Sequence, residues 1–282
     1  MSGHDELPKK YSTLAFAGVL IASYLIFAVA SFIFVGTFGP IRIFELPEVI
    51  IVLGINYLTL TVFPLAGWRM MRASLAFLGL SKEIFFKTLP VGVVAFFIAG
   101  AWQFILGWND DITLVPDRPL FLLAVFVPLI ALVIPLIDMK YAPGLRLPIG
   151  VITLAIWSVQ AYLFPVGDED LMNSLKEVAT NILNLAVLTF LIGIYVPFIE
   201  EFFFRGFILN QFSKKYQPFF AIFLTAALFG FAHLGSPGIV SLALFAIPMG
   251  MLSYFNKSIY PAVWAHAGLN LSAMAIVWLS AN

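Results

Sequence analysis

The sequence lacks cysteine altogether and has few charged residues. Without cysteine, disulfide bonds, thiol catalysis and thiolate metal sites are excluded. Charged residues make up 11% of the 282, whereas an ordinary soluble domain has about 25%. The net charge is zero, so there is no basic footprint for nucleic acid. Because 62% of the residues are hydrophobic, the surplus apolar side chains need surroundings other than water, and we expect a lipid bilayer.

Long apolar runs recur along the whole chain. A helix needs about 20 mainly apolar residues to cross a bilayer. Nine segments meet this condition: 13–38, 48–67, 85–107, 119–137, 147–165, 179–212, 218–234, 237–255 and 259–279. The sequence therefore predicts an all-α, polytopic transmembrane helix bundle of eight or nine spans. The run 13–38 is longer than the apolar part of a signal peptide, so we interpret it as a retained first helix.

Basic residues fall mainly on alternate connections between these runs. With the N-terminus in the cytoplasm, the inner connections hold 12 of the 15 lysines and arginines, and only Arg42, Arg118 and Lys176 lie outside. This asymmetry is what the positive-inside rule predicts. We therefore expect a multi-pass protein of the cell (plasma) membrane with a cytoplasmic N-terminus. The sequence does not indicate whether the protein is a monomer or an oligomer.

Two stretches depart from a plain spanning helix. The run 179–212 is too long for one straight crossing and contains Pro197, which removes a backbone hydrogen bond. We expect a bend near Val196–Pro197. The stretch 73–86 mixes apolar and charged residues, and it is either a short interfacial helix or a loop followed by an early helix start.

Three groups of polar side chains interrupt the apolar runs in the last third of the chain. They are Glu200, Glu201 and Arg205 in the first group, His233 in the second, and His266 with Asn270 in the third. Ionisable groups at membrane depth are costly, and they normally face a partner or a cavity. Such groups are therefore candidates for a functional site.

The spacing of these groups predicts that they converge. Glu200 and His233 each lie about 16 residues from the turn at Lys214–Gln217, or roughly 24 Å along a helix. In an antiparallel hairpin, the two side chains therefore reach the same depth. His266 and Asn270 are four residues apart and share one helix face. We expect a single site between the last four helices.

Glu201 and Arg205 are also four residues apart, so they can form an ion pair within one helix. This pair has two interpretations, a purely structural ion pair or a direct part in the site.

The converging groups are sufficient for amide hydrolysis. A buried carboxylate can act as general base toward water, and an imidazole and an amide can stabilise an oxyanion. Other interpretations remain open. Glu200, His233 and His266 are also a three-ligand set for zinc. Buried Glu, His and Arg also build the proton relays of proton-coupled transporters, although no inverted repeat of the kind found in many carriers is present.

At these residues the sequence resembles the CAAX-protease and bacteriocin-processing (CPBP) family of intramembrane glutamic endopeptidases, also called the abortive-infection family. The family motifs Glu-Glu-x-x-x-Arg, Phe-x-x-x-His and His-x-x-x-Asn occur here in that order, at 200–205, 229–233 and 266–270. We therefore divide the chain into an N-terminal transmembrane region, 1–165, and a CPBP-like catalytic core, 166–282.

The resemblance implies a role for each motif residue. Glu200 would activate the attacking water with His233, while His266 and Asn270 would form the oxyanion site. Glu201 would orient the first motif together with its arginine partner. The resemblance also implies a metal-independent reaction with no cofactor and a membrane-associated peptide or protein as substrate. A non-catalytic immunity or scaffold protein on the same fold is a further alternative.

Overall fold

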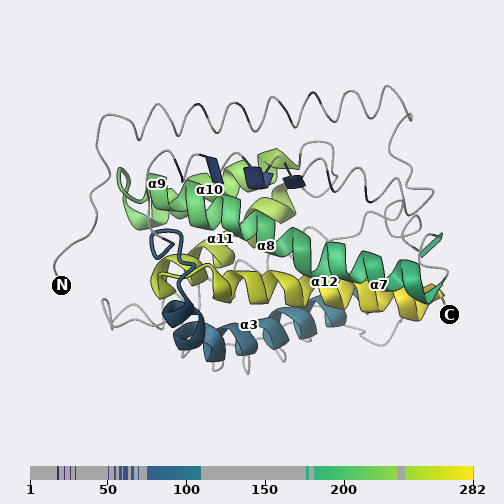
Figure 1. Ribbon diagram of the computed structural model, residues 1–282. Coiled ribbons are helices and arrows are strands. Elements are labelled where there is room, and N and C mark those ends of the chain that lie inside the picture. Colours follow the sequence, from purple (N-terminus) through teal and green to yellow (C-terminus); the bar gives the residue numbers. More distant parts are fainter. Residues whose placement is uncertain are drawn as a thin grey trace.

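A computed structural model describes residues 75–108, 181–233 and 239–281, the pair 176–177 and isolated positions between 18 and 69. Every regular element in these ranges is a helix (Figure 1). The all-α class is therefore confirmed for the part of the chain that the structure describes.

The predicted apolar runs correspond to helices wherever the structure describes them continuously. The runs 85–107, 218–234, 237–255 and 259–279 match, in that order, the four helices α3 (Lys82–Trp108), α10 (Pro218–Ala232), α11 (Ile239–Asn256) and α12 (Tyr260–Ala281). The described positions within 13–38 and 48–67 are also helical. The runs 119–137 and 147–165 lie outside the described residues, so the count of eight or nine spans stays a prediction.

Among the described residues, two helical stretches are long and apolar enough to cross a membrane. They are Ile182–Phe212 and Tyr260–Leu279, and two shorter apolar helices are Pro218–Ala232 and Leu242–Asn256. The surface of α10 carries a row of exposed aromatic side chains, Phe219, Phe220, Phe223 and Phe231. Adjoining exposed apolar side chains are typical of surfaces that contact a partner or a membrane.

The stretch Ile182–Phe212 is one helix in which the hydrogen-bond register changes several times. Its parts are α7 (Ile182–Phe190), the π-helix η3 (Leu191–Tyr195), α8 (Val196–Glu201), the π-helix η4 (Phe202–Leu209) and α9 (Asn210–Phe212). Pro197 lies in the first turn of α8, directly after η3. The hydrogen-bond register therefore changes directly before Pro197, while the backbone stays helical, and the bend near Val196–Pro197 stays a prediction.

Residues 75–79 form a turn, and α3 begins at Lys82. Gly79 has a φ of 71°, and a Cβ at this position would lie 2.9 Å from Ser258 Cα. Leu78 is fully buried against Phe202. The loop-and-helix-start interpretation of 73–86 is thus correct for residues 75–86, and a separate interfacial helix is wrong there, because 75–79 is a turn and the helix that follows is α3 itself.

α12 packs lengthwise against α3 (Figure 1). Glycines permit the close approach: a Cβ on Gly268 would meet the carbonyl oxygen of Phe96, and one on Gly100 would lie 2.9 Å from Ser272 Oγ. Small residues at such contacts are typical of membrane helices. Helices from the predicted N-terminal region and the predicted catalytic core therefore pack together, and the division at residue 165 stays a prediction.

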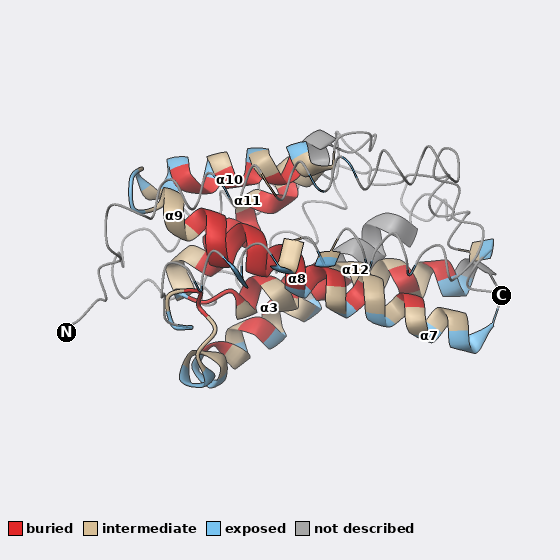
Figure 2. Ribbon diagram, turned by 45° about the horizontal axis from the view of Figure 1, so that its top comes forward, coloured by how far each residue is buried: buried red, intermediate tan, exposed pale blue. Residues whose placement is uncertain are grey.

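Buried residues gather where η4, α10, α11 and α12 meet (Figure 2). Phe203, Phe204 and Phe229 are at most 1% exposed, and their rings stack edge to face. Such pairs add about 0.5–1.5 kcal/mol beyond area burial. This aromatic cluster forms a rigid, apolar wall beside the polar groups of the last third of the chain.

Candidate active site

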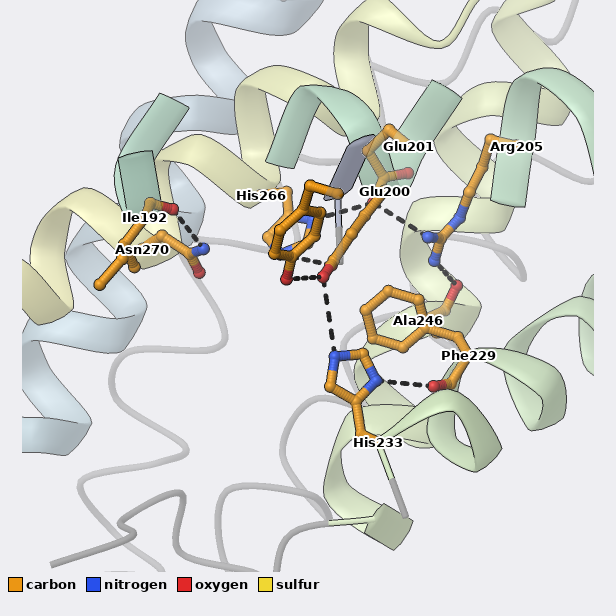
Figure 3. A network of polar contacts seen from close by, with 10 residues as sticks. Ile192, Glu200, Glu201, Arg205, Phe229, His233, Ala246, His266 and Asn270 are labelled. Atoms are coloured by element: carbon orange, nitrogen blue, oxygen red, sulfur yellow. Dashed lines mark hydrogen bonds and ion pairs between the residues drawn. The ribbon is translucent and has the colours of Figure 1, made fainter. Parts of the chain in front are cut away.

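Five of the six polar motif residues meet between α8, η4, α10 and α12, and Asn270 lies apart from them beside Ile192 (Figure 3). Glu201 and Arg205 form the predicted ion pair, with Arg205 Nη1 donating to Glu201 Oε1 at 2.9 Å. Arg205 Nη2 donates to the carbonyl oxygen of Ala246 in α11, also at 2.9 Å. The guanidinium carbon lies 5.0 Å from the centre of the Phe229 ring. The guanidinium of the ion pair is thus in contact with protein groups from α10 and α11 as well as with Glu201.

Glu200 lies between the two histidines, as the spacing predicts. His233 Nε2 is 3.7 Å from Glu200 Oε1, and His266 Nε2 is 3.7 Å from Glu200 Oε2. Glu200 and His266 are 4% and 5% exposed, whereas the His233 side chain is 28% exposed. Both distances are too long for a direct hydrogen bond. The carboxylate therefore faces an imidazole nitrogen on each side without being bonded to either.

The tautomers of both histidines follow from their other ring nitrogens. His233 Nδ1 lies 2.8 Å from the carbonyl oxygen of Phe229, which can only accept, so Nδ1 carries the proton. His266 Nδ1 lies 2.9 Å from Glu201 Oε1 and donates to that carboxylate. In the neutral rings, each Nε2 is therefore an unprotonated acceptor directed at Glu200.

The end of α10 explains how His233 acquires its partner. His233 caps this helix, and its backbone N–H bonds to Gly230 O at 3.0 Å. An α-helical bond would instead use the carbonyl of Phe229, four residues back. Tightening of the last turn therefore leaves Phe229 O for the imidazole ring.

Asn270 lies one helical turn beyond His266, but its amide is engaged elsewhere. Asn270 Nδ2 donates to Ile192 O at 2.9 Å. That oxygen is available because Val196 N–H bonds to Leu191 O and Pro197 has no N–H to offer. Within the described part of the chain, no hydrogen bond joins Asn270 to another motif side chain.

Tyr57 belongs to the site and was not found by sequence reasoning. Its hydroxyl donates to Glu200 Oε1 at 2.7 Å, and its ring lies edge-on to Tyr195 at 6.4 Å. Tyr57 occupies the middle of the apolar run 48–67, which is a signal that could have been used. A buried phenol normally finds a hydrogen-bond partner, and mid-span residues share the depth at which Glu200 was expected.

The described residues contain no cluster of side chains that is arranged as a metal site. Among these residues, no group of three His, Cys, Asp or Glu side chains is arranged to hold a metal ion. Both Nδ1 atoms already have partners, and Glu200 presents one oxygen to each Nε2. The expectation of a metal-independent site therefore stays a prediction for experiment.

A family model described as Type II CAAX prenyl endopeptidase Rce1-like matches residues 182–272, or 91 of the 282 residues. The match confirms the resemblance inferred from the motifs, and the matched segment contains all seven residues that define the three motifs. Tyr57 lies outside it. No curated protein and no solved structure matched. The matched family is one of proteases, which supports a peptidase, and with the apolar helices it indicates an integral membrane protein.

Proposed function

We propose that this chain, whose residues 182–272 match an Rce1-like family model, is an intramembrane endopeptidase that uses a glutamate-activated water. One observation carries the proposal: the buried Glu200 carboxylate lies between two imidazole Nε2 atoms, each 3.7 Å away. Each gap is too long for a direct hydrogen bond, but one water beside the two atoms can bond to both at ordinary hydrogen-bond lengths.

Glu200 acts as the general base. It takes a proton from a water that also donates to His233 Nε2, because that nitrogen carries a lone pair when Nδ1 donates to Phe229 O. The water oxygen then attacks the carbonyl carbon of the scissile amide. His233 is the more exposed of the two histidines, which suits a residue that meets incoming water.

His266 and Asn270 stabilise the oxyanion. With both carboxylates ionised and Arg205 charged, the cluster has a formal charge of −1, which one proton on an imidazole neutralises. A proton on His266 Nε2 converts this nitrogen into a donor while Glu201 holds Nδ1. The Asn270 amide carries two N–H groups, so its bond to Ile192 O leaves one for the substrate.

The tetrahedral intermediate collapses when Glu200 returns its proton to the leaving nitrogen. The C–N bond breaks, the oxyanion re-forms the carbonyl, and a carboxylic acid and an amine leave the site. General acid–base catalysis by one positioned side chain contributes about 10²–10⁴-fold to the rate. The same carboxylate therefore serves as base and then as acid.

We propose a membrane-associated peptide or protein as the substrate class. The description of the matched family names prenyl endopeptidases, so a peptide with a prenylated cysteine near its C-terminus is the first probe to use. The same peptide without the lipid is the matched probe.

The experiment compares cell membranes containing the wild-type chain with membranes containing Glu200→Gln. We expect one or more uncut precursors to accumulate with Glu200→Gln. The purified chain in lipid nanodiscs should then cut this precursor peptide, and His233→Ala should abolish the cleavage. Glu83→Gln is the control, because Glu83 is an exposed carboxylate in the first turn of α3. Equal cleavage by wild-type and Glu200→Gln protein would refute the proposal.

A further inference from the structure

We propose that Tyr57 is a positioning residue for the catalytic carboxylate, supplied by the N-terminal part of the chain. The inference rests on the proposed function, because it assigns Tyr57 a role through Glu200. Tyr57 lies outside the three motifs and outside the segment that matches the family model. The site is therefore completed by a residue that the motifs do not contain.

Among the described residues, the contact between Tyr57 and Glu200 is the shortest polar contact of this carboxylate. Tyr57 Oη to Glu200 Oε1 is 2.7 Å, whereas each imidazole nitrogen stands 3.7 Å from its carboxylate oxygen. Among the described residues, Tyr57 is the one side chain within hydrogen-bonding distance of this carboxylate. A charge-assisted bond of this length is about twice as strong as a neutral one.

This bond fixes the orientation of the carboxylate. Glu200 has several rotatable bonds, and neither histidine is close enough to hold its oxygens in one plane. The phenol holds Oε1, and so keeps Oε1 directed at His233 and Oε2 directed at His266. An ionised carboxylate has about four acceptor positions, so one phenol leaves the others for water.

Tyr57 is itself held in place by its neighbours. Its ring lies edge-on to Tyr195, and Thr61 Oγ1 donates to the Tyr57 carbonyl oxygen at 2.7 Å. Leu60, on the next turn, packs against the buried hydrophobic cluster that contains Phe203, Phe204 and Phe229. Tyr57 thus lies on the helix face that is directed at the core, and the packing of this helix holds the phenol next to Glu200.

The test is Tyr57→Phe, which removes one oxygen and keeps the ring. We expect kcat for the precursor peptide to fall about tenfold to a hundredfold, the range that corresponds to one hydrogen bond to a charged group. We expect KM to stay within about twofold, because the phenol acts on the base and not on substrate binding. Tyr195→Phe is the matched control and should keep kcat within about twofold, because no hydrogen bond from Tyr195 to Glu200 is present. An unchanged or raised kcat in Tyr57→Phe, or a loss confined to KM, would overturn the inference.

A second measurement does not depend on turnover. The shift in Tm caused by Tyr57→Phe is compared in the wild-type and Glu200→Ala backgrounds, and coupling requires a larger shift when Glu200 is present. Equal shifts in both backgrounds would mean that the two residues are not coupled. If wild-type and Glu200→Gln proteins cleave alike, the proposed function fails. If only Glu200→Gln is inactive and Tyr57→Phe is fully active, the role of Tyr57 fails while the proposed function stands.

Discussion

Glu200 and Glu201 are adjacent, almost equally buried and yet placed in opposite surroundings. Glu201 has its partners at hydrogen-bonding distance: Arg205 Nη1 and His266 Nδ1 both lie 2.9 Å from its Oε1. Glu200 meets His233 and His266 only at 3.7 Å, and Tyr57 is its one close donor among the described residues. We refer to the Glu201 surroundings as the closed side and to the Glu200 surroundings as the open side.

The difference separates two tasks within one helical turn. On the closed side, a carboxylate and a guanidinium compensate each other where an unpaired buried charge would be costly. On the open side, no cation among the described residues lies within hydrogen-bonding distance of the carboxylate, and its one direct hydrogen bond there comes from Tyr57. His266 connects the two sides, because Nδ1 belongs to the closed side and Nε2 to the open one. Glu201 therefore keeps a proton on His266 Nδ1, and this decides that Nε2 of the neutral ring faces Glu200 as an acceptor.

Removing the arginine should break the closed side with the largest effect on stability. We expect Arg205→Met to lower the free energy of unfolding by about 3–5 kcal/mol, because it leaves Glu201 buried without its main counter-charge. Equilibrium unfolding in mixed micelles measures this loss. Lys82→Met is the control, since Lys82 is exposed at the start of α3. A loss no larger than that of the control would mean that the ion pair is dispensable.

Exchanging each carboxylate for its amide should sharpen the division between the two sides. We expect Glu201→Gln to lower the free energy of unfolding by about 1–3 kcal/mol, because Arg205 loses its charged acceptor. Glu200→Gln should change stability less and reduce kcat more, by about 10²–10⁴-fold. Unfolding and turnover are measured for both variants. Should the two variants lose stability and activity in the same proportion, the division into a closed and an open side is wrong.

Phe229 contacts both the closed and the open side. Replacing its ring with a smaller side chain should therefore lower both stability and activity, each by less than the substitutions above. The ring lies 5.0 Å from the Arg205 guanidinium and 4.8 Å from the His233 ring. We expect Phe229→Leu to cost about 1–2 kcal/mol through lost aromatic and cation–π contacts. Its backbone carbonyl remains for His233, so kcat should fall only a few-fold. A large loss of activity with no loss of stability would contradict this expectation.

Zinc removal should have the smallest effect. We expect a zinc chelator to leave cleavage of the precursor peptide unchanged, because the proposed reaction activates water with Glu200 and His233 and uses no metal ion. Cleavage rates before and after chelation provide the measurement. Loss of activity that added zinc restores would show that the glutamate mechanism is wrong.

The convergence of the motifs could be predicted from sequence because it depends on local geometry. Glu200 and His233 stand equally far from one turn, and the fixed rise of a helix converts equal residue counts into equal depth. The ion pair between Glu201 and Arg205 follows from their four-residue spacing in the same way. These features need no knowledge of how the helices cross.

The rest of the site depends on tertiary packing and could not be predicted. Tyr57 meets Glu200 only because two helices far apart in sequence come together at one angle. The sequence placed Asn270 on the same face as His266, but not its bond to Ile192 O. That bond depends on the π-helical register before Pro197, which apolar periodicity does not reveal.

The two histidine tautomers differ in how easily mutation can remove their control. His266 is held by a side chain, so a single codon change at Glu201 alters its partner. His233 is held by a main-chain carbonyl, which every residue type at position 229 would still provide. The tautomer of His266 therefore depends on the residue type at position 201, whereas the tautomer of His233 depends on the backbone at the end of α10. Random substitution should therefore remove control of the His266 tautomer more readily than control of the His233 tautomer.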